Sequence, residues 1–105
     1  MVVDVTDQTF EEEVIKSTQP VLVALWAPWC RPCHMVEPVV DKLAEKYKDR
    51  FKFCRLNVDE NPKTAARYRI MSIPTLIFFK GGKAVDTVIG AVSEAVLQPK
   101  IDTLL

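Results

Sequence analysis

Several features are scarce in this sequence of 105 residues, and each scarcity excludes a class of protein. Three cysteines are too few for a disulfide scaffold, and their odd number favours a reducing compartment over secretion. No charge is in excess, because 14 basic and 14 acidic side chains cancel to a formal net charge of zero. That balance argues against a strongly basic nucleic-acid-binding protein and against a polybasic membrane anchor.

Long apolar runs are also lacking. The longest, residues 21–30, contains a proline and is too short to span a bilayer. The N-terminal residues do not have the cationic and then apolar pattern of a signal peptide, so we expect none. There is no internal repeat or linker-like stretch. With 49% apolar residues and nine aromatic side chains, the chain is predicted to be a single domain over residues 1–105.

Strand and helix patterns alternate along the chain. Apolar runs predict strands at residues 2–5, 21–27, 51–58, 75–80 and 83–89, the last two joined by the two-residue hairpin turn Gly81-Gly82. Helical spacing of apolar residues predicts a long helix over residues 32–48, with shorter helices near 10–15, at 62–68 and after Ser93. The order βαβαβαββα predicts an α/β fold with a mixed sheet covered by helices on both faces.

Polar residues ahead of two short helices are predicted to cap them. Thr6 or Asp7 precedes the first helix, and Asn61 stands directly before Pro62, a favoured first helical residue. We expect Asp59, just upstream, to serve the same helix N-terminus as Asn61.

The sequence WAPWCRPC, residues 26–33, concentrates the reactive chemistry. A strand ends and a helix begins there, so Cys30 is expected at a helix N-terminus, where free amides and the helix dipole favour a thiolate. Cys33, one turn later, can reach back to it. Cys30 would attack a substrate disulfide and Cys33 would resolve the mixed disulfide. Pro32 stiffens the first turn without removing a needed amide.

A bare C-x-x-C also occurs as half of a zinc site. This chain has no second pair of ligands, because only Cys54 and His34 remain and His34 is expected to point elsewhere. We therefore expect no metal site. Cys54 lies in an apolar strand and is predicted to be a small buried hydrophobe, with a regulatory thiol as the alternative.

The sequence resembles the thioredoxin family. The resemblance rests on WAPWCRPC together with Ile73-Pro74-Thr75, Lys80-Gly81-Gly82 and Ile89-Gly90-Ala91, and it runs from about Val2 to Leu104. It implies the thioredoxin fold, a five-stranded mixed β-sheet flanked by four helices, with a cis peptide at Ile73-Pro74 facing the disulfide. It further implies a protein-disulfide reductase, or dithiol electron carrier, that needs no bound cofactor because the cysteine pair is the redox couple.

The resemblance also implies partners and a binding surface. An apolar platform around the disulfide would comprise Trp29, Val58, Ile73, Pro74, Ile89, Gly90 and Ala91, with the backbone of Ile73 binding an extended substrate segment. Ordinary strand packing is the alternative for Ile73 and Ile89. The implied partners are disulfide-containing target proteins and a thioredoxin reductase, either NADPH–flavin or ferredoxin-dependent. We expect a monomer in the cytoplasm or plastid stroma, with no nucleic acid or membrane as partner.

Two positions depart from the family pattern. Arg31 stands where the family usually has glycine. As a cation beside Cys30, Arg31 would stabilise the thiolate and so raise the reduction potential of the protein. The alternative is that Arg31 is simply a solvated surface side chain. Ala24 stands where family members typically carry a buried aspartate that helps to move the proton of the second cysteine. The basic neighbour of that aspartate is retained as Arg55. Without the acid, the sequence offers no obvious general base for Cys33, so water or Cys30 must serve.

Three functional hypotheses follow from these residues. The first is a thioredoxin-type reductase of protein disulfides. Arg31 motivates the second, a more oxidising or isomerase-like enzyme. The third is a binding subunit, such as a processivity or assembly factor, in which the cysteines are incidental. All three share the same fold.

Overall fold

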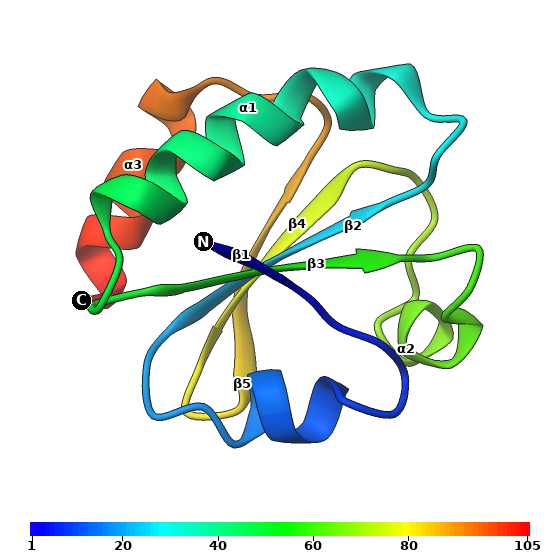
Figure 1. The fold of residues 1–105 in the computed structure, drawn as a ribbon, viewed down its shortest axis with the longest axis horizontal. Helices are drawn as coiled ribbons and strands as arrows, with labels where there is room; N and C mark the ends of the chain where they lie inside the picture. The colour runs from blue at the N-terminus through cyan, green and yellow to red at the C-terminus, as the bar shows by residue number, and fades with distance from the viewer.

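A central five-stranded sheet organises the chain (Figure 1). The structure, a computed structural model, describes residues 1–105. The strands are β1 (Val2–Asp4), β2 (Val21–Trp26), β3 (Lys52–Asn57), β4 (Thr75–Lys80) and β5 (Lys83–Ile89), in the spatial order β1-β3-β2-β4-β5. β3 is parallel to both β1 and β2, whereas β4 is antiparallel to β2 and β5. This mixed sheet confirms the predicted α/β fold.

Four helices cover the two faces of the sheet. They are η1 (Glu11–Ile15), α1 (Arg31–Lys46), α2 (Pro62–Arg67) and α3 (Glu94–Leu104). In Figure 1, α1 and α3 lie on one side of the strands, and α2 and the blue η1 lie on the other. The first helix is a single five-residue π-helix, which agrees with the helix predicted near residues 10–15. None of the helices is long and apolar enough to cross a bilayer.

Each face of the sheet has its own hydrophobic core. Phe78 of β4 packs in the layer under α1 and α3, with Leu43 and Ile101, whereas its neighbour Phe79 packs on the opposite face with Phe10. Successive side chains of a strand point to opposite faces, so two adjacent buried phenylalanines require a sheet that is covered on both sides. This double coverage explains why the central strands read as continuous apolar runs.

The cap of α2 is not the predicted one. Asn61 forms no capping bond. Its amide oxygen instead accepts a hydrogen bond from the backbone of Asp7 at 2.8 Å. The carboxylate of Asp7 accepts hydrogen bonds from the backbone amides of Lys63 (3.2 Å) and Thr64 (2.8 Å). It also accepts one from the Thr64 hydroxyl at 2.7 Å. The cap of α2 therefore comes from the loop after β1. Ahead of η1, the hydroxyl of Thr6 accepts a hydrogen bond from the backbone amide of Thr9.

Candidate functional site

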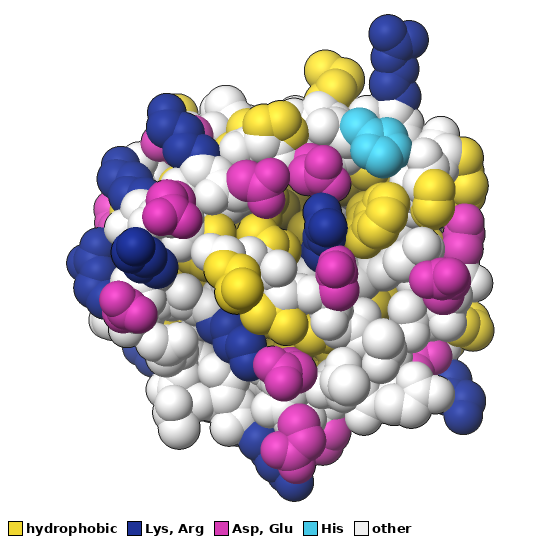
Figure 2. All heavy atoms as spheres, in the orientation of Figure 1, with side chains coloured by type: hydrophobic (Ala, Val, Ile, Leu, Met, Phe, Trp, Pro, Cys, Tyr) yellow, Lys and Arg dark blue, Asp and Glu magenta, His cyan; other side chains and the backbone are white.

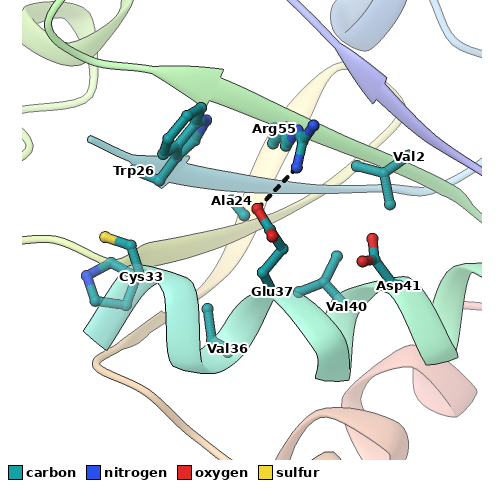
Figure 3. A pocket seen from close by; sticks show the side chains of 10 residues that line it. Val2, Ala24, Trp26, Cys33, Val36, Glu37, Val40, Asp41 and Arg55 are labelled. Atoms are coloured by element: carbon teal, nitrogen blue, oxygen red, sulfur yellow. Dashed lines mark hydrogen bonds and ion pairs between the residues drawn. The ribbon is translucent and has the colours of Figure 1, made fainter. Parts of the chain in front are cut away.

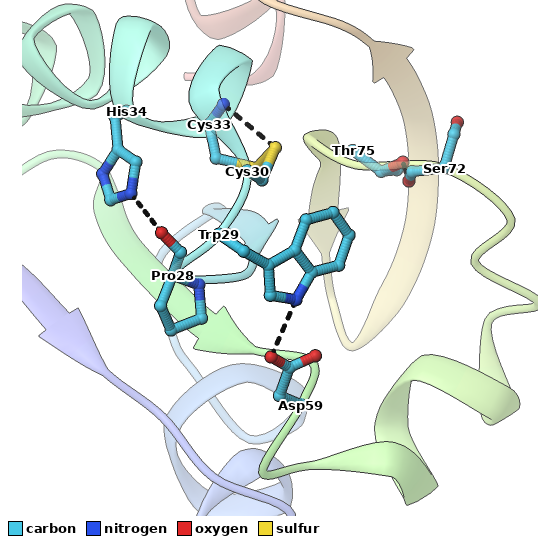
Figure 4. The surroundings of a disulfide bond; sticks show 8 residues. All are labelled: Pro28, Trp29, Cys30, Cys33, His34, Asp59, Ser72 and Thr75. Atoms are coloured by element: carbon cyan, nitrogen blue, oxygen red, sulfur yellow. Dashed lines mark hydrogen bonds between the residues drawn. A yellow bond between two sulfur atoms is a disulfide. The ribbon is translucent and has the colours of Figure 1, made fainter.

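Cys30 and Cys33 form a disulfide at the N-terminus of α1 (Figure 4). β2 ends at Trp26, and Cys30 is the N-cap of α1, with an extended backbone that its position before the helix requires. The backbone amide of Cys33 donates to Cys30 Sγ at 3.2 Å. Both residues are 4% exposed. The predicted juxtaposition is therefore confirmed, and an amide and a helix dipole both point at the sulfur of Cys30.

The segment opposite the disulfide carries the expected cis proline. The Ile73-Pro74 peptide is cis, as the family resemblance implied. Pro74 is buried and lines a cavity with Cys33, and Ile73 packs against the two cysteines. Gly90, with a φ of 100°, donates its amide to the carbonyl of Pro74 at 2.9 Å. This bond ties two parts of the predicted platform together.

The indole of Trp29 lies on the surface beside the disulfide. Trp29 is 71% exposed, and its Nε1 donates to Asp59 Oδ2 at 3.0 Å (Figure 4). Asp59 therefore orients the tryptophan and does not cap α2, which corrects the prediction. His34 Nε2 donates to the carbonyl of Pro28 at 2.7 Å, so this histidine braces the loop before the cysteines.

The remaining platform residues surround the disulfide at its rim. Val58 packs against the cysteines, while Ile89 is 65% exposed at the end of β5. Met71, which the sequence analysis missed, is 94% exposed and lines two adjoining surface hollows, one with Trp29 and the other with Ile89. The signal that could have found it is its place two residues before Ile73, in the connection between α2 and β4. An exposed apolar side chain there has no core to fill.

A small cavity of about 20 Å³ lies on the inner side of Cys33 (Figure 3). Strand register places Arg55 of β3 opposite both Asp4 of β1 and Ala24 of β2. Arg55 donates to Asp4 Oδ1 at 2.6 Å and to Glu37 Oε2 at 2.9 Å. The hydrogen bond to Asp4, with the negative charge of Glu37, raises the pKa of Arg55, so it stays a cation.

The mouth of this cavity opens between α1 and the edge strand β1. Figure 2 shows a hollow on this face, with apolar side chains at its floor and acidic and basic side chains at its rim. Glu37 and Asp41 of α1 line the cavity together with Arg55. Glu37 is the functional candidate that sequence reasoning missed, although its spacing of four residues from Cys33 places both on one helix face.

Two other residues singled out from the sequence, Arg31 and Cys54, make no polar side-chain contact in the site. Arg31, the first residue of α1, is exposed and takes part in none of the ion pairs of the protein. Cys54 is fully buried in the core under η1, and this burial raises the pKa of its thiol to about 12. That confirms the prediction that Cys54 is buried. No group of three or more His, Cys, Asp or Glu side chains lies close enough to hold a metal ion.

A cysteine pair at a helix N-terminus, facing a cis proline on a mixed sheet, is an arrangement for thiol–disulfide exchange. The family model for thioredoxin matches residues 1–103. Thioredoxin 1 of Synechococcus elongatus is 55% identical over 98 residues, covering 93% of this chain and 92% of that protein. Thioredoxin of Pyropia yezoensis is 57% identical, covering 89% and 87%. A chloroplastic M-type thioredoxin of Chlamydomonas reinhardtii is 50% identical, covering 96% and 72%.

The chain belongs to the thioredoxin family. It is a dithiol–disulfide oxidoreductase that reduces protein disulfides by exchange through Cys30 and Cys33. Family membership implies disulfide-containing target proteins and a reductase that restores the dithiol.

Proposed function

We propose that Cys30 is the attacking thiol and Cys33 the resolving thiol. The observation that carries this assignment is the asymmetry of the pair. Cys30 Sγ accepts a hydrogen bond from the backbone amide of Cys33 at the start of α1, and this bond favours the thiolate of Cys30. Cys33 instead lines the inner cavity. In the reaction, Cys30 attacks the target disulfide, and Cys33 then displaces the target from the mixed disulfide.

Insulin-disulfide reduction with dithiothreitol tests the assignment. Cys30→Ser is expected to reduce the rate to the uncatalysed background. Cys33→Ser is expected to accumulate a covalent mixed disulfide with insulin, visible by non-reducing electrophoresis, which Cys30→Ser does not form. Cys54→Ala is the matched control, because the third cysteine lies in the opposite core layer. A mixed disulfide formed by Cys30→Ser and not by Cys33→Ser would reverse the two roles.

We further propose that target proteins dock on the apolar rim of the disulfide. This platform comprises Trp29, Val58, Ile73, Pro74, Ile89, Gly90 and Ala91, as the family resemblance implies. Exposed apolar side chains at its edge support it, because Trp29 and Ile89 gain burial only when a partner covers them. We expect the backbone of Ile73 to pair with an extended segment of the target.

A pair of matched variants on β5 tests the platform. Ile89→Ser should raise KM for insulin several-fold and leave the reaction with a small disulfide unchanged. Val85→Ser alters another exposed apolar residue of the same strand, 49% exposed and remote from the cysteines. Equal KM values for the two variants would remove Ile89 from the platform.

Arg31 supports a second candidate role, as a more oxidising or isomerase-like protein. It is adjacent to Cys30 and has no ion-pair partner that would neutralise it, so its charge remains available to the thiolate of Cys30. We propose that the redox potential is tuned by Arg31 together with Pro32, Trp29, Arg55 and Pro74. Redox titration against glutathione should give a lower potential for Arg31→Gly than for the wild type. Identical midpoints would leave Arg31 as a surface charge.

The cellular setting is also a proposal. We propose that residues 1–105 act as one domain and as a monomer, without cofactor, nucleic acid or membrane partner, in the cytoplasm or the plastid stroma. Similarity to cyanobacterial and chloroplastic thioredoxins supports these two locations. The chain would be recharged by a thioredoxin reductase, either NADPH–flavin or ferredoxin-dependent. Reduction rates measured with each purified reductase decide between them, and gel filtration tests the monomer.

A further inference from the structure

The resolving step requires Cys33 to lose a proton in a place that solvent reaches poorly. Cys33 is 4% exposed and lines the small inner cavity. A thiol attacks only as the thiolate, so its proton needs an acceptor within hydrogen-bond reach, either directly or through one water. Ala24, on the wall of the same cavity, has no group that could accept it.

Glu37 is placed to receive this proton through a single water. Cys33 and Glu37 are neighbours on one face of α1, because side chains four residues apart on a helix have Cβ atoms about 5–6 Å apart. In Figure 3, Glu37 extends from α1 toward Arg55, with Ala24 beside its carboxylate. The cavity volume of about 20 Å³ exceeds the roughly 10–15 Å³ that one water needs.

The cavity also has the polar partners that a water requires. A buried water typically makes two to four hydrogen bonds. Besides Cys33 and Glu37, Trp26 lines the cavity, and its buried Nε1 has no hydrogen-bond partner in the protein. A buried indole N–H is normally satisfied, so it is a natural third partner.

Charges around Glu37 hold its carboxylate in place. Arg55 of β3 donates to Oε2 and leaves Oε1 without a hydrogen bond in the protein. The other charged groups of this surface are Asp4 of β1, which shares Arg55, and Asp41 of α1. The Glu37 side chain is 42% exposed, so a proton it receives can pass on to bulk solvent.

We propose that Glu37 accepts the proton of Cys33 through one water and releases it to solvent, so that the resolving thiol is deprotonated from α1. In the mixed disulfide, Cys33 Sγ–H gives its proton to the water, which gives one to Glu37 Oε1. Cys33 Sγ then bonds to Cys30 Sγ, the bond between Cys30 and the target sulfur breaks, and the target sulfur leaves with the electron pair and is protonated by solvent. The dithiol loses two electrons, and the target disulfide gains them.

The test separates the attack by Cys30 from the resolution by Cys33. Reduced protein is mixed with oxidised glutathione and quenched in acid, and mass spectrometry follows the mixed disulfide between Cys30 and glutathione. Glu37→Gln should form it within about twofold of the wild-type rate but resolve it at least about tenfold more slowly, since general-base help is typically worth about 10²–10⁴-fold. The matched control Glu45→Gln alters an exposed carboxylate of the same helix that pairs only with Lys48.

Two further variants separate proton transfer from a structural effect. Glu37→Asp keeps a carboxylate and should resolve faster than Glu37→Gln. Ala24→Asp combined with Glu37→Gln places a carboxylate on the other wall of the cavity and should restore resolution. The proposal is overturned if Glu37→Gln resolves within twofold of Glu45→Gln, if it slows both steps equally, or if Asp41→Asn alone has the large effect. This inference rests on the roles proposed for the two cysteines. If wild type forms no mixed disulfide on Cys30, that assignment itself fails.

Discussion

The Asp7 carboxylate offers the most direct test of how α2 is held in this fold. Its carboxylate receives three hydrogen bonds from Lys63 and Thr64, at 2.7–3.2 Å. Loss of an N-cap typically costs about 0.5–2 kcal/mol, and loss of a negative charge at a helix N-terminus costs about 0.3–1 kcal/mol more. We therefore expect Asp7→Ala to lower the free energy of unfolding by about 2 kcal/mol. For a chain of this length that corresponds to a Tm lower by about 9 °C.

The pH dependence of stability gives a second signature of the same carboxylate. Burial alone would raise the pKa of Asp7, but the hydrogen bonds from Thr64 and Lys63 outweigh it and hold the pKa below its usual value. A carboxyl with a depressed pKa in the folded state stabilises the fold above its ordinary pKa of about 3.9. That contribution is lost as pH falls through the depressed value. The Tm difference between wild type and Asp7→Ala should therefore be full at pH 7 and shrink below about pH 4.

Thermal unfolding followed by circular dichroism measures both effects. Glu60→Ala is the control, because Glu60 is an exposed acid just before α2 whose side chain makes no hydrogen bond, and its Tm should change by no more than about 2 °C. The reasoning is refuted if Asp7→Ala unfolds with the Tm of Glu60→Ala. It is also refuted if the difference from wild type stays constant between pH 7 and pH 3.

Two further predictions concern single residues. Gly81 and Gly82 both have positive φ, but only at Gly82 would a Cβ meet the Ile15 carbonyl, at 2.9 Å. Gly81→Ala should lower the free energy of unfolding by about 1 kcal/mol, and Gly82→Ala should lower it by at least about 1 kcal/mol more. Equal urea midpoints for the two variants would contradict this. Burial raises the pKa of Cys54 to about 12. In folded, reduced protein at pH 8, iodoacetamide should therefore alkylate Cys30 long before Cys54, which should react only after unfolding in guanidinium. Mass spectrometry of native and unfolded samples checks this order, and equal rates would contradict it.

The element order and the reactive pair were predictable because both depend on local spacing. Apolar residues at helical or alternating intervals predict the elements, and the structure confirms all five strands and four helices to within a few residues. The spacing of two residues between Cys30 and Cys33 is sufficient to bring them together across one helical turn. Burial of Cys54 followed from the apolar character of its own strand.

The polar contacts were not predictable, because they join residues distant in the chain. The cap of α2 comes from Asp7, 57 residues before Thr64, so Asn61 was the reasonable local candidate and was wrong. Asp59 likewise accepts a hydrogen bond from Trp29, 30 residues away, and does not cap the adjacent helix.

The sequence alone therefore determined the class of fold and the two sulfurs that react. Only the tertiary structure decided which charges stand near them. Ala24 suggested a resolving thiol without a general base, because the sequence places no acid at that position of β2. The pairing of β1, β3 and β2 sets Arg55 opposite Asp4 and Ala24, and packing of α1 on the sheet brings Glu37 to the same point. Strand register and helix packing are collective results of burying the whole core, so no local pattern specifies them.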